Sequence, residues 1–222
     1  MRLLSFAVLA FAACVLASDS PTSSDSCRSA PFNLIVLSSN STLNGTHLFA
    51  CHEGAAVKAL CTNSSRYLRQ GPNPPPLEPS IVRFFQNHTT KSRSEEANKT
   101  GYAFGELTWD FPNMPHSLGM KAGLQDKESN VLVPVFLPTN VHSNLITFDK
   151  EDKLFVWTWS QKESVSKNTA MNREQKAFYD WYICMTDVGY KLETVAWLED
   201  GKSNNPSCQK VDIKKIPEGS LP

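Results

Sequence analysis

The sequence predicts an all-β fold, and three observations support this prediction. Short runs of β-branched and aromatic residues recur along the chain, polar or glycine-containing turns separate them, and the two candidate helical segments are too short to stand alone. We expect a single β-sandwich of the jelly-roll type, with a closed β-barrel or a β-trefoil as the alternatives.

About ten predicted strands account for most of the chain. Asn44-Gly45 predicts a hairpin between the first two strands, and Asp187-Val188-Gly189 predicts another hairpin late in the chain. The proline-rich segment 71–79 is expected to be an extended connector, since proline lacks the backbone donor that a sheet needs. The helical candidates are 53–60, which equally suits a bulged strand, and 172–178. The predicted strands are 32–37, 46–51, 81–85, 102–109, 131–136, 144–148, 154–159, 178–186, 190–198 and 211–216.

The N-terminal segment 1–17 has the features of a secretory signal peptide. Arg2 supplies the positive charge, the apolar run 3–16 is too short for a membrane span, and Val15 and Ala17 are small residues at the −3 and −1 positions of a cleavage before Ser18. We therefore expect a secreted, extracellular protein. A lipoprotein signal, acylated at Cys14, is the alternative.

The domain organisation follows from this cleavage. We expect a flexible N-terminal tail at 18–30 and one secreted β domain at 31–217. No second apolar run of about 18 residues follows the signal, so no membrane span is expected.

N-glycosylation sequons cluster in the first half of the chain. Because a branched glycan cannot be buried, occupied sites must face water. Some of these sequons are expected to be unused turns, and the second half of the chain is the more available for contact with a partner. The acceptor asparagines are Asn40, Asn44, Asn63, Asn87 and Asn98.

Charge excludes some partners. The chain has 22 Lys and Arg residues against 22 Asp and Glu residues, and the two signs are intermixed. Without a basic surface, the sequence gives no electrostatic case for binding nucleic acid or anionic membranes.

Five cysteines remain after the expected cleavage: Cys27, Cys51, Cys61, Cys184 and Cys208. Two disulfides among them can be arranged in many ways, but short loops close with the least loss of entropy, which favours Cys51 with Cys61 and Cys184 with Cys208. Cys27 is then the odd thiol. The spacings do not match the ligand pairs of zinc sites, so no metal and no cofactor are expected.

Catalytic motifs are weak. Glu106 and Asp110 share one face of a predicted strand, as in jelly-roll glycoside hydrolases, but they are roughly 13 Å apart, beyond the ~5–9.5 Å between the two carboxyl groups of glycosidases. His52-Glu53 begins like a zinc-protease helix, yet position 56 is alanine where the second histidine is needed. A triad assembled from distant residues stays open.

Aromatic residues give the strongest binding signal. Trp157 and Trp159 project from the same face of a predicted strand, roughly 7 Å apart, where exposed rings stack on sugar rings. Tyr179 and Trp181 repeat the spacing. The alternative is that all four rings belong to the core, because tryptophan is highly buried on average.

Four motifs carry a resemblance to a known family. They are Ala-Cys-His-Glu-Gly-Ala-Ala with Leu-Cys at 50–61, Gly-Glu-Leu-Thr-Trp at 105–109, the segment 148–155, and Trp-Tyr-Ile-Cys followed by Asn-Pro-Ser-Cys between 181 and 208. In order and spacing, the chain resembles a family of secreted proteins of filamentous fungi (ascomycetes) that is defined as a domain of unknown function. The resemblance implies one secreted domain, the cysteine pairs 51/61 and 184/208, and no established activity.

Together these features predict a non-catalytic extracellular domain that binds a glycan or a protein ligand. The alternatives are a glycoside hydrolase acting on cell-wall polysaccharide through Glu106 or Asp110, and a structural protein of the cell surface. The sequence does not assign an oligomeric state.

Overall fold

The computed structural model describes residues 26–54, 57–65, 73, 76, 78–89, 104–110, 117–137, 145–160, 174–199 and 201–219. The expected signal peptide, Asn98 and most of the proline-rich connector therefore lie outside the described residues, as does the side chain of Cys27. Among the described residues, no helix is long and apolar enough to cross a membrane.

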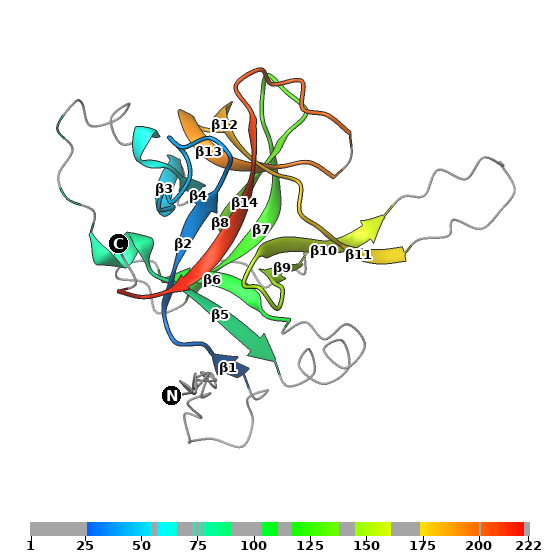
Figure 1. The fold of residues 1–222 in the computed structure, drawn as a ribbon. Helices are drawn as coiled ribbons and strands as arrows, with labels where there is room; N and C mark the ends of the chain where they lie inside the picture. The colour runs from blue at the N-terminus through cyan, green and yellow to red at the C-terminus, as the bar shows by residue number, and fades with distance from the viewer. Residues whose placement is uncertain are drawn as a thin grey trace, which may run out of the picture.

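The larger of the two sheets is an 11-stranded antiparallel sheet, called the barrel below. From β5 the pairing runs through β2, β14, β12, β13, β4, β8 and β7 to β6, which pairs back with β5 (Figure 1). The sheet thus closes on itself, and the predicted all-β, sandwich- or barrel-like fold is confirmed. Its strands are β1 (Ser26–Arg28), β2 (Phe32–Leu37), β3 (Phe49–Gly54), β4 (Val57–Cys61), β5 (Phe84–Thr89), β6 (Glu106–Asp110), β7 (Ser117–Gln125), β8 (Leu132–Leu137), β12 (Trp181–Asp187), β13 (Lys191–Trp197) and β14 (Gln209–Pro217).

A second, three-stranded sheet lies beside the barrel, with β10 (Leu154–Ser160) between β9 (Leu145–Phe148) and β11 (Glu174–Phe178) (Figure 1). One face of this small sheet packs against the barrel core. The ring centroids of Phe148 and Phe32 are 5.4 Å apart, and those of Phe178 and Trp197 are 6.2 Å apart. The two sheets therefore share one hydrophobic core.

Large aromatic rings fill the centre of this core. Trp109, Trp181 and Trp197 are 2% exposed or less. Two of them also bond to the backbone: Trp109 Nε1 donates to Ser80 O of the short helix α2 (Pro79–Val82), and Trp181 Nε1 donates to Leu154 O of β10. The second bond ties the small sheet to the barrel.

The turn between β9 and β10 forms another tie between the sheets. Asp149 Oδ1 accepts hydrogen bonds from the backbone N–H groups of Glu151 and Lys153, which shapes the turn, and Asp152 has a positive φ of 63°. The turn docks on β14 through ion pairs from Lys153 to Asp212 at 3.2 Å and from Lys215 to Asp152 at 3.0 Å. The charged segment 149–153 therefore fastens the two sheets together.

Most predicted strands correspond to observed ones, but β1 and β7 were not predicted, and residues 81–82 of the predicted strand 81–85 lie in α2. Of the segment 53–60, residues 53–54 and 57–60 lie in strands of the β3–β4 hairpin, with a register shift between His52 and Gly54, which matches the bulged-strand alternative rather than the helical one. Residues 174–178 of the second helical candidate form β11. The predicted strand 178–186 is divided between β11 and β12. The hairpin predicted at Asn44-Gly45 is present but short: Ile35 forms an antiparallel bridge with His47 and Val36 N donates to Thr46 O, and β3 then pairs with β4.

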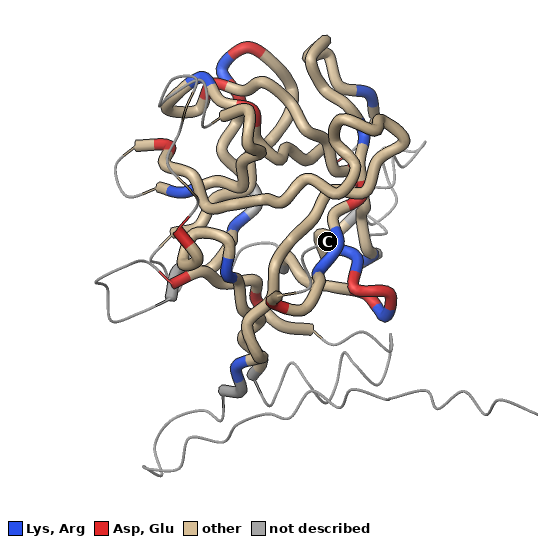
Figure 2. Tube along the Cα trace, turned by 60° about the vertical axis from the view of Figure 1, so that its left-hand side comes forward, with Lys and Arg blue, Asp and Glu red and all other residues tan. Residues whose placement is uncertain are grey.

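Two disulfides join Cys51 to Cys61 and Cys184 to Cys208, which are the pairs that short-loop closure favours. Along the Cα trace, Lys and Arg positions are interspersed with Asp and Glu positions (Figure 2).

Candidate functional site

The outward face of the small sheet carries a row of aromatic side chains. Phe155, Trp157 and Trp159 follow one another at period two on β10, so their side chains lie on the same face. Exposure rises along the row: Phe155 is fully buried, Trp157 is half-buried and Trp159 is 51% exposed. The row thus runs from the interior to the surface.

The buried end of the row is covered by the segment before β6. The ring of Phe104 lies 5.2 Å from Trp157 in an edge-to-face arrangement and 6.4 Å from Phe155. The backbone of this segment is held by a contact of 2.6 Å between His88 Nδ1 and Phe104 O, and by a bond from Gly105 N to Thr147 Oγ1. These buried bonds hold Phe104 in place, so its ring packs at a fixed position against the rings of Phe155 and Trp157.

On β11, the described residues opposite the exposed end of the row are uncharged. Gln175 is directly opposite Trp159 in the β10–β11 register, and Ala177 is directly opposite Trp157. Lys176 instead lies on the other face, where its Nζ is 4.6 Å from the centroid of the Phe178 ring. In the described part of this surface, the large ring of Trp159 therefore lies beside the carboxamide of Gln175.

The second aromatic pair does not form a matching surface. Tyr179 is half-buried, and its hydroxyl donates to Asp149 Oδ2 at 3.1 Å. Trp181 is fully buried in the barrel core, so it is unavailable for stacking on a ligand. The reason is that β11 ends at Phe178 and β12 begins at Trp181, so the two residues do not lie on one strand.

The two carboxylates considered for glycoside hydrolysis are each engaged in an ion pair. Glu106 Oε1 is 2.5 Å from Lys121 Nζ, and Asp110 Oδ2 is 2.6 Å from Arg28, whose guanidinium also stacks over the Phe85 ring. Both carboxylates therefore already have a cationic partner within the fold.

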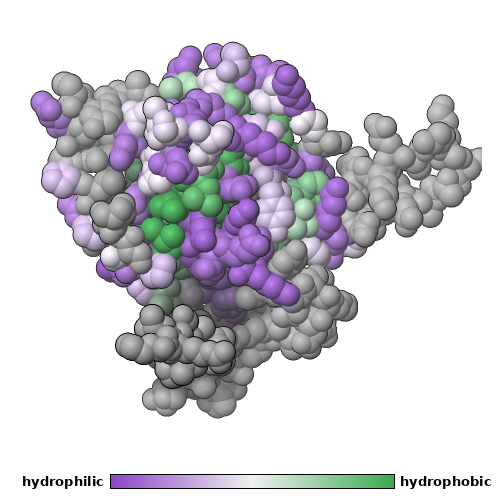
Figure 3. Space-filling model, in the orientation of Figure 1, coloured by the Kyte–Doolittle hydropathy of each residue, from purple (hydrophilic) through white to green (hydrophobic). Residues whose placement is uncertain are grey.

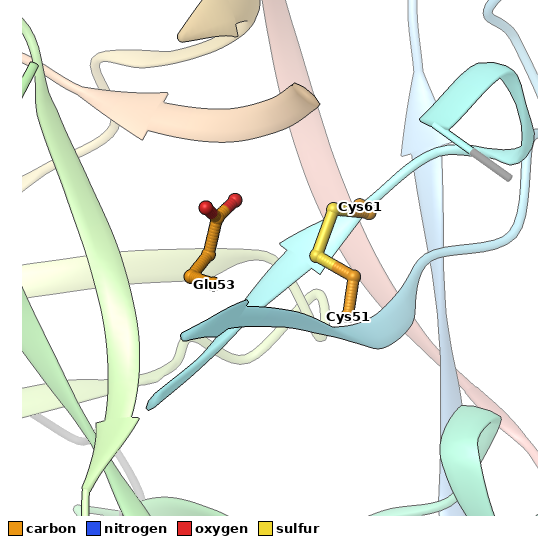
Figure 4. Close-up of side chains that lie close together, drawn as sticks. All are labelled: Cys51, Glu53 and Cys61. Atoms are coloured by element: carbon orange, nitrogen blue, oxygen red, sulfur yellow. A yellow bond between two sulfur atoms is a disulfide. The ribbon is translucent and has the colours of Figure 1, made fainter. Parts of the chain in front are cut away.

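A second cluster surrounds the disulfide of the β3–β4 hairpin. Cys51, Glu53 and Cys61 are all buried, with potential ligand atoms within 4.8 Å of one another (Figure 4). Both sulfur atoms belong to the disulfide, so thiolate ligands for a metal are absent in this oxidised form. Glu53 Oε2 instead accepts a hydrogen bond from Tyr190 N, which braces the turn between β12 and β13.

His52 also lies beside this turn, with its ring centroid 5.8 Å from that of Tyr190. It is on a strand rather than on a helix, which removes the basis for comparing it with a zinc-protease motif.

The sequon asparagines occupy different environments. Asn44 and Asn63 are exposed, Asn40 and Asn87 are half-buried, and Asn98 lies outside the described residues. Figure 3 shows that hydrophobic side chains also gather on the face over β2, the strand that leads into the turn with Asn40 and Asn44. On β2 the partly exposed apolar residues are Ile35 and Leu37.

These features define a disulfide-bridged all-β domain with an aromatic surface on its smaller sheet. A family model described as a domain of unknown function, DUF7907, matches residues 29–217, and the chain belongs to this family. No curated protein and no solved structure matches the chain.

Sequence reasoning singled out Trp157 and Trp159, but it missed their neighbours. Phe104 comes from a segment distant in the sequence, and Gln175 comes from a segment expected to be helical. Only the strand pairing places Gln175 opposite Trp159. A period-two pattern in 174–178, where Gln175 and Ala177 alternate with Lys176 and Phe178, was the available signal.

Proposed function

We propose that this protein is a secreted, non-catalytic binding domain that holds a neutral glycan on the outward face of its small sheet. The observation that carries the proposal is Trp159, which is 51% exposed at the end of an otherwise buried aromatic row. A large ring held open to solvent is unusual for tryptophan, whose burial contributes strongly to stability.

The chemistry of the surface favours a sugar. The apolar C–H face of a pyranose packs on an aromatic ring, while its hydroxyls need donors and acceptors at the ring's edge. The carboxamide of Gln175 supplies both a donor and an acceptor directly across from Trp159. Because the neighbouring described side chains on this face are uncharged, a neutral glycan fits better than an acidic one.

The place of Trp159 in the fold also favours this surface as the binding site. The small sheet is fastened to the barrel by the Trp181–Leu154 hydrogen bond and by the charged turn, so Trp159 sits on a fixed support. Binding on a rigid surface loses less conformational entropy than binding on a mobile one. The described sequon asparagines lie on or beside barrel strands, and none of them is in β10 or β11.

The test compares Trp159→Ala with Tyr190→Ala. Tyr190 is also a well-exposed aromatic residue, at 43%, but it lies in the β12–β13 turn of the barrel. Each variant is incubated with insoluble chitin, glucan and mannan, and the bound fraction is measured. We expect Trp159→Ala to lose binding and Tyr190→Ala to retain it.

Release of reducing sugar from the same polysaccharides separates binding from hydrolysis. Binding without sugar release supports the proposal. Sugar release abolished by Glu106→Gln would instead establish the hydrolase, and a failure to bind any polysaccharide would favour a structural protein or a protein ligand. Enzymatic removal of N-glycans is expected to leave binding intact.

A further inference from the structure

We propose that the fold sorts the N-glycosylation sequons: Asn44 carries an N-linked glycan, Asn87 stays unmodified, and Asn63 is modified only on chains that have not yet docked β4 against β13. The inference rests on the extracellular location in the proposed function, because N-glycans are added in the secretory pathway. It is independent of the glycan-binding surface.

Asn44 presents its amide in the orientation that a glycan requires. The residue is exposed in the turn that follows β2, beside Gly45 with its positive φ of 78°. The fold uses the Oδ1 atom of Asn44, which accepts a hydrogen bond from Ser38 N at 3.1 Å. N-glycosylation replaces one hydrogen on Nδ2 and leaves Oδ1 as an acceptor, so the modified side chain keeps this bond.

Asn87, by contrast, lies within the sheet, where a glycan does not fit. It is in β5, with β1 on one side and β6 on the other, and its direct neighbours across the sheet are Arg28 and Glu106. Both neighbours are held in ion pairs, to Asp110 and Lys121 respectively.

The amide of Asn87 has one end enclosed, since its Oδ1 is buried and makes no hydrogen bond. Exchanging the oxygen and nitrogen positions would enclose the nitrogen instead. A branched sugar here would have to emerge between two fixed charged pairs. A chain glycosylated at this position is therefore expected to fail to pair β5 with both neighbours.

Asn63 is exposed, but the third residue of its sequon is not. Ser65 is only 2% exposed, and its hydroxyl donates to Glu193 O at 2.7 Å and accepts from Glu193 N at 2.8 Å. Thr62 and Ser64 also donate to the carboxylate of Glu193. Since the sequon needs an accessible Ser or Thr at its third position, docking of β4 on β13 hides the Ser65 hydroxyl although Asn63 itself stays exposed.

The time for which the Asn63 sequon stays accessible to glycosylation should depend on the nearby disulfide. Cys61 is two residues before Asn63 and pairs with Thr194 of β13. Its bridge to Cys51 closes the β3–β4 hairpin. Removing this bridge should delay docking and leave the sequon open for longer, whereas the Cys184–Cys208 bridge joins β12 to the segment before β14.

The experiment expresses the full chain in a secreting eukaryotic cell and compares Asn44→Asp with Asn87→Asp. Both replacements keep a side-chain oxygen but cannot carry a glycan. We expect Asn44→Asp to lose one glycan step in gel mobility and Asn87→Asp to lose none. Peptide mapping should find a sugar on Asn44 and unmodified Asn87. Loss of a step in a secreted Asn87→Asp protein, or an unmodified Asn44 in the parent, would overturn the proposal.

A parallel expression with a heterologous secretion leader in place of residues 1–17 separates this inference from the proposed location. If only the heterologous leader yields secreted, glycosylated protein, the proposed extracellular location is wrong, and the same two variants still test the sorting.

The timing at Asn63 is tested by the double variant Cys51→Ser with Cys61→Ser, using Cys184→Ser with Cys208→Ser as the matched control. Occupancy is measured on total cell protein, so variants that are not secreted still count. We expect partial occupancy of Asn63 in the parent, and an increase in the first variant only. Full occupancy in the parent, or equal occupancy in both double variants, would contradict the dependence on docking.

Discussion

The five tryptophans are divided between the two sheets. Those of the barrel serve stability, and those of the small sheet are more exposed. The three in the barrel are almost completely buried, whereas on the small sheet Trp157 is half-buried and Trp159 is 51% exposed. A closed sheet has an interior that large rings must fill. A three-stranded sheet resting on that barrel has a second face, where a ring contributes little to folding and stays available for a ligand.

The largest expected effect comes from the barrel side of this comparison. Trp181→Ala should lower the free energy of unfolding by about 3–5 kcal/mol, the usual cost of truncating a buried aromatic residue. Trp159→Ala should change it by less than about 0.5 kcal/mol, as for ordinary surface substitutions. Urea unfolding of both variants provides the measurement.

Trp181→Phe keeps an aromatic ring and should be milder, which provides a variant for study if Trp181→Ala does not fold. Similar costs for Trp159→Ala and Trp181→Ala would remove the distinction between the two sheets.

Gly189 tests whether the turns at the rim of the barrel are packed as closely as its interior. A Cβ atom at Gly189 would lie 1.8 Å from the backbone oxygen of Glu53, whereas at Gly119 it would lie 2.1 Å from the end of the Glu106 side chain. Backbone cannot move aside as easily as a side chain. Gly189→Ala should therefore cost about 1–3 kcal/mol and Gly119→Ala less. Thermal unfolding of the two variants checks the order, and the reverse order would contradict it.

The Asp149 turn tests the connection between the sheets. Asp149→Ala removes the acceptor of two backbone N–H groups and of the Tyr179 hydroxyl, and should cost about 1–2 kcal/mol. Asp149→Asn keeps one acceptor oxygen and should cost less. Urea unfolding gives the energies, and near-ultraviolet circular dichroism reports the aromatic packing. Equal stability of both variants and the parent would show that the turn does not fasten the sheets.

The smallest expected effect concerns pH and the segment beside β2. Partial burial lowers the pKa of His47 from its ordinary value of 6.5. The unfolded chain then binds a proton more readily than the folded chain. The free energy of unfolding is therefore highest above pH 6.5 and falls as the pH drops through the folded pKa. His47→Gln should remove this part of the pH dependence, measured by unfolding between about pH 7 and about pH 5. An unchanged pH dependence in the variant would contradict it.

The sequence predicted much of the fold because hydrophobic alternation is local. β2, β10 and β13 have β-branched or aromatic residues at regular spacing, and their predicted and observed bounds are close. β7 was missed because its sequence, SLGMKAGLQ, has two glycines and no β-branched residue. Pairing with β6 and β8 on both sides stabilises it as a strand despite that composition.

The candidate site was less predictable, since it depends on how strands are placed in space. The period-two spacing of Trp157 and Trp159 correctly put them on one face. The same spacing for Tyr179 and Trp181 was misleading, because the chain passes from one sheet to the other between them. Exposure of Trp159 also follows from which face of the small sheet meets the barrel, and a single sequence does not contain that information.

Closure of the barrel has a consequence for self-association. Strand edges expose unpaired backbone groups that recruit other chains, and a closed sheet removes most of them. In the described part of the molecule, β11 is an outer strand of the small sheet, paired with β10 alone. Its sequence, EQKAF, contains an acid, an amide and an exposed lysine. Charge and polarity of this kind oppose pairing with a second copy, so β11 keeps the small sheet from extending into a fibre at the edge nearest to Trp159.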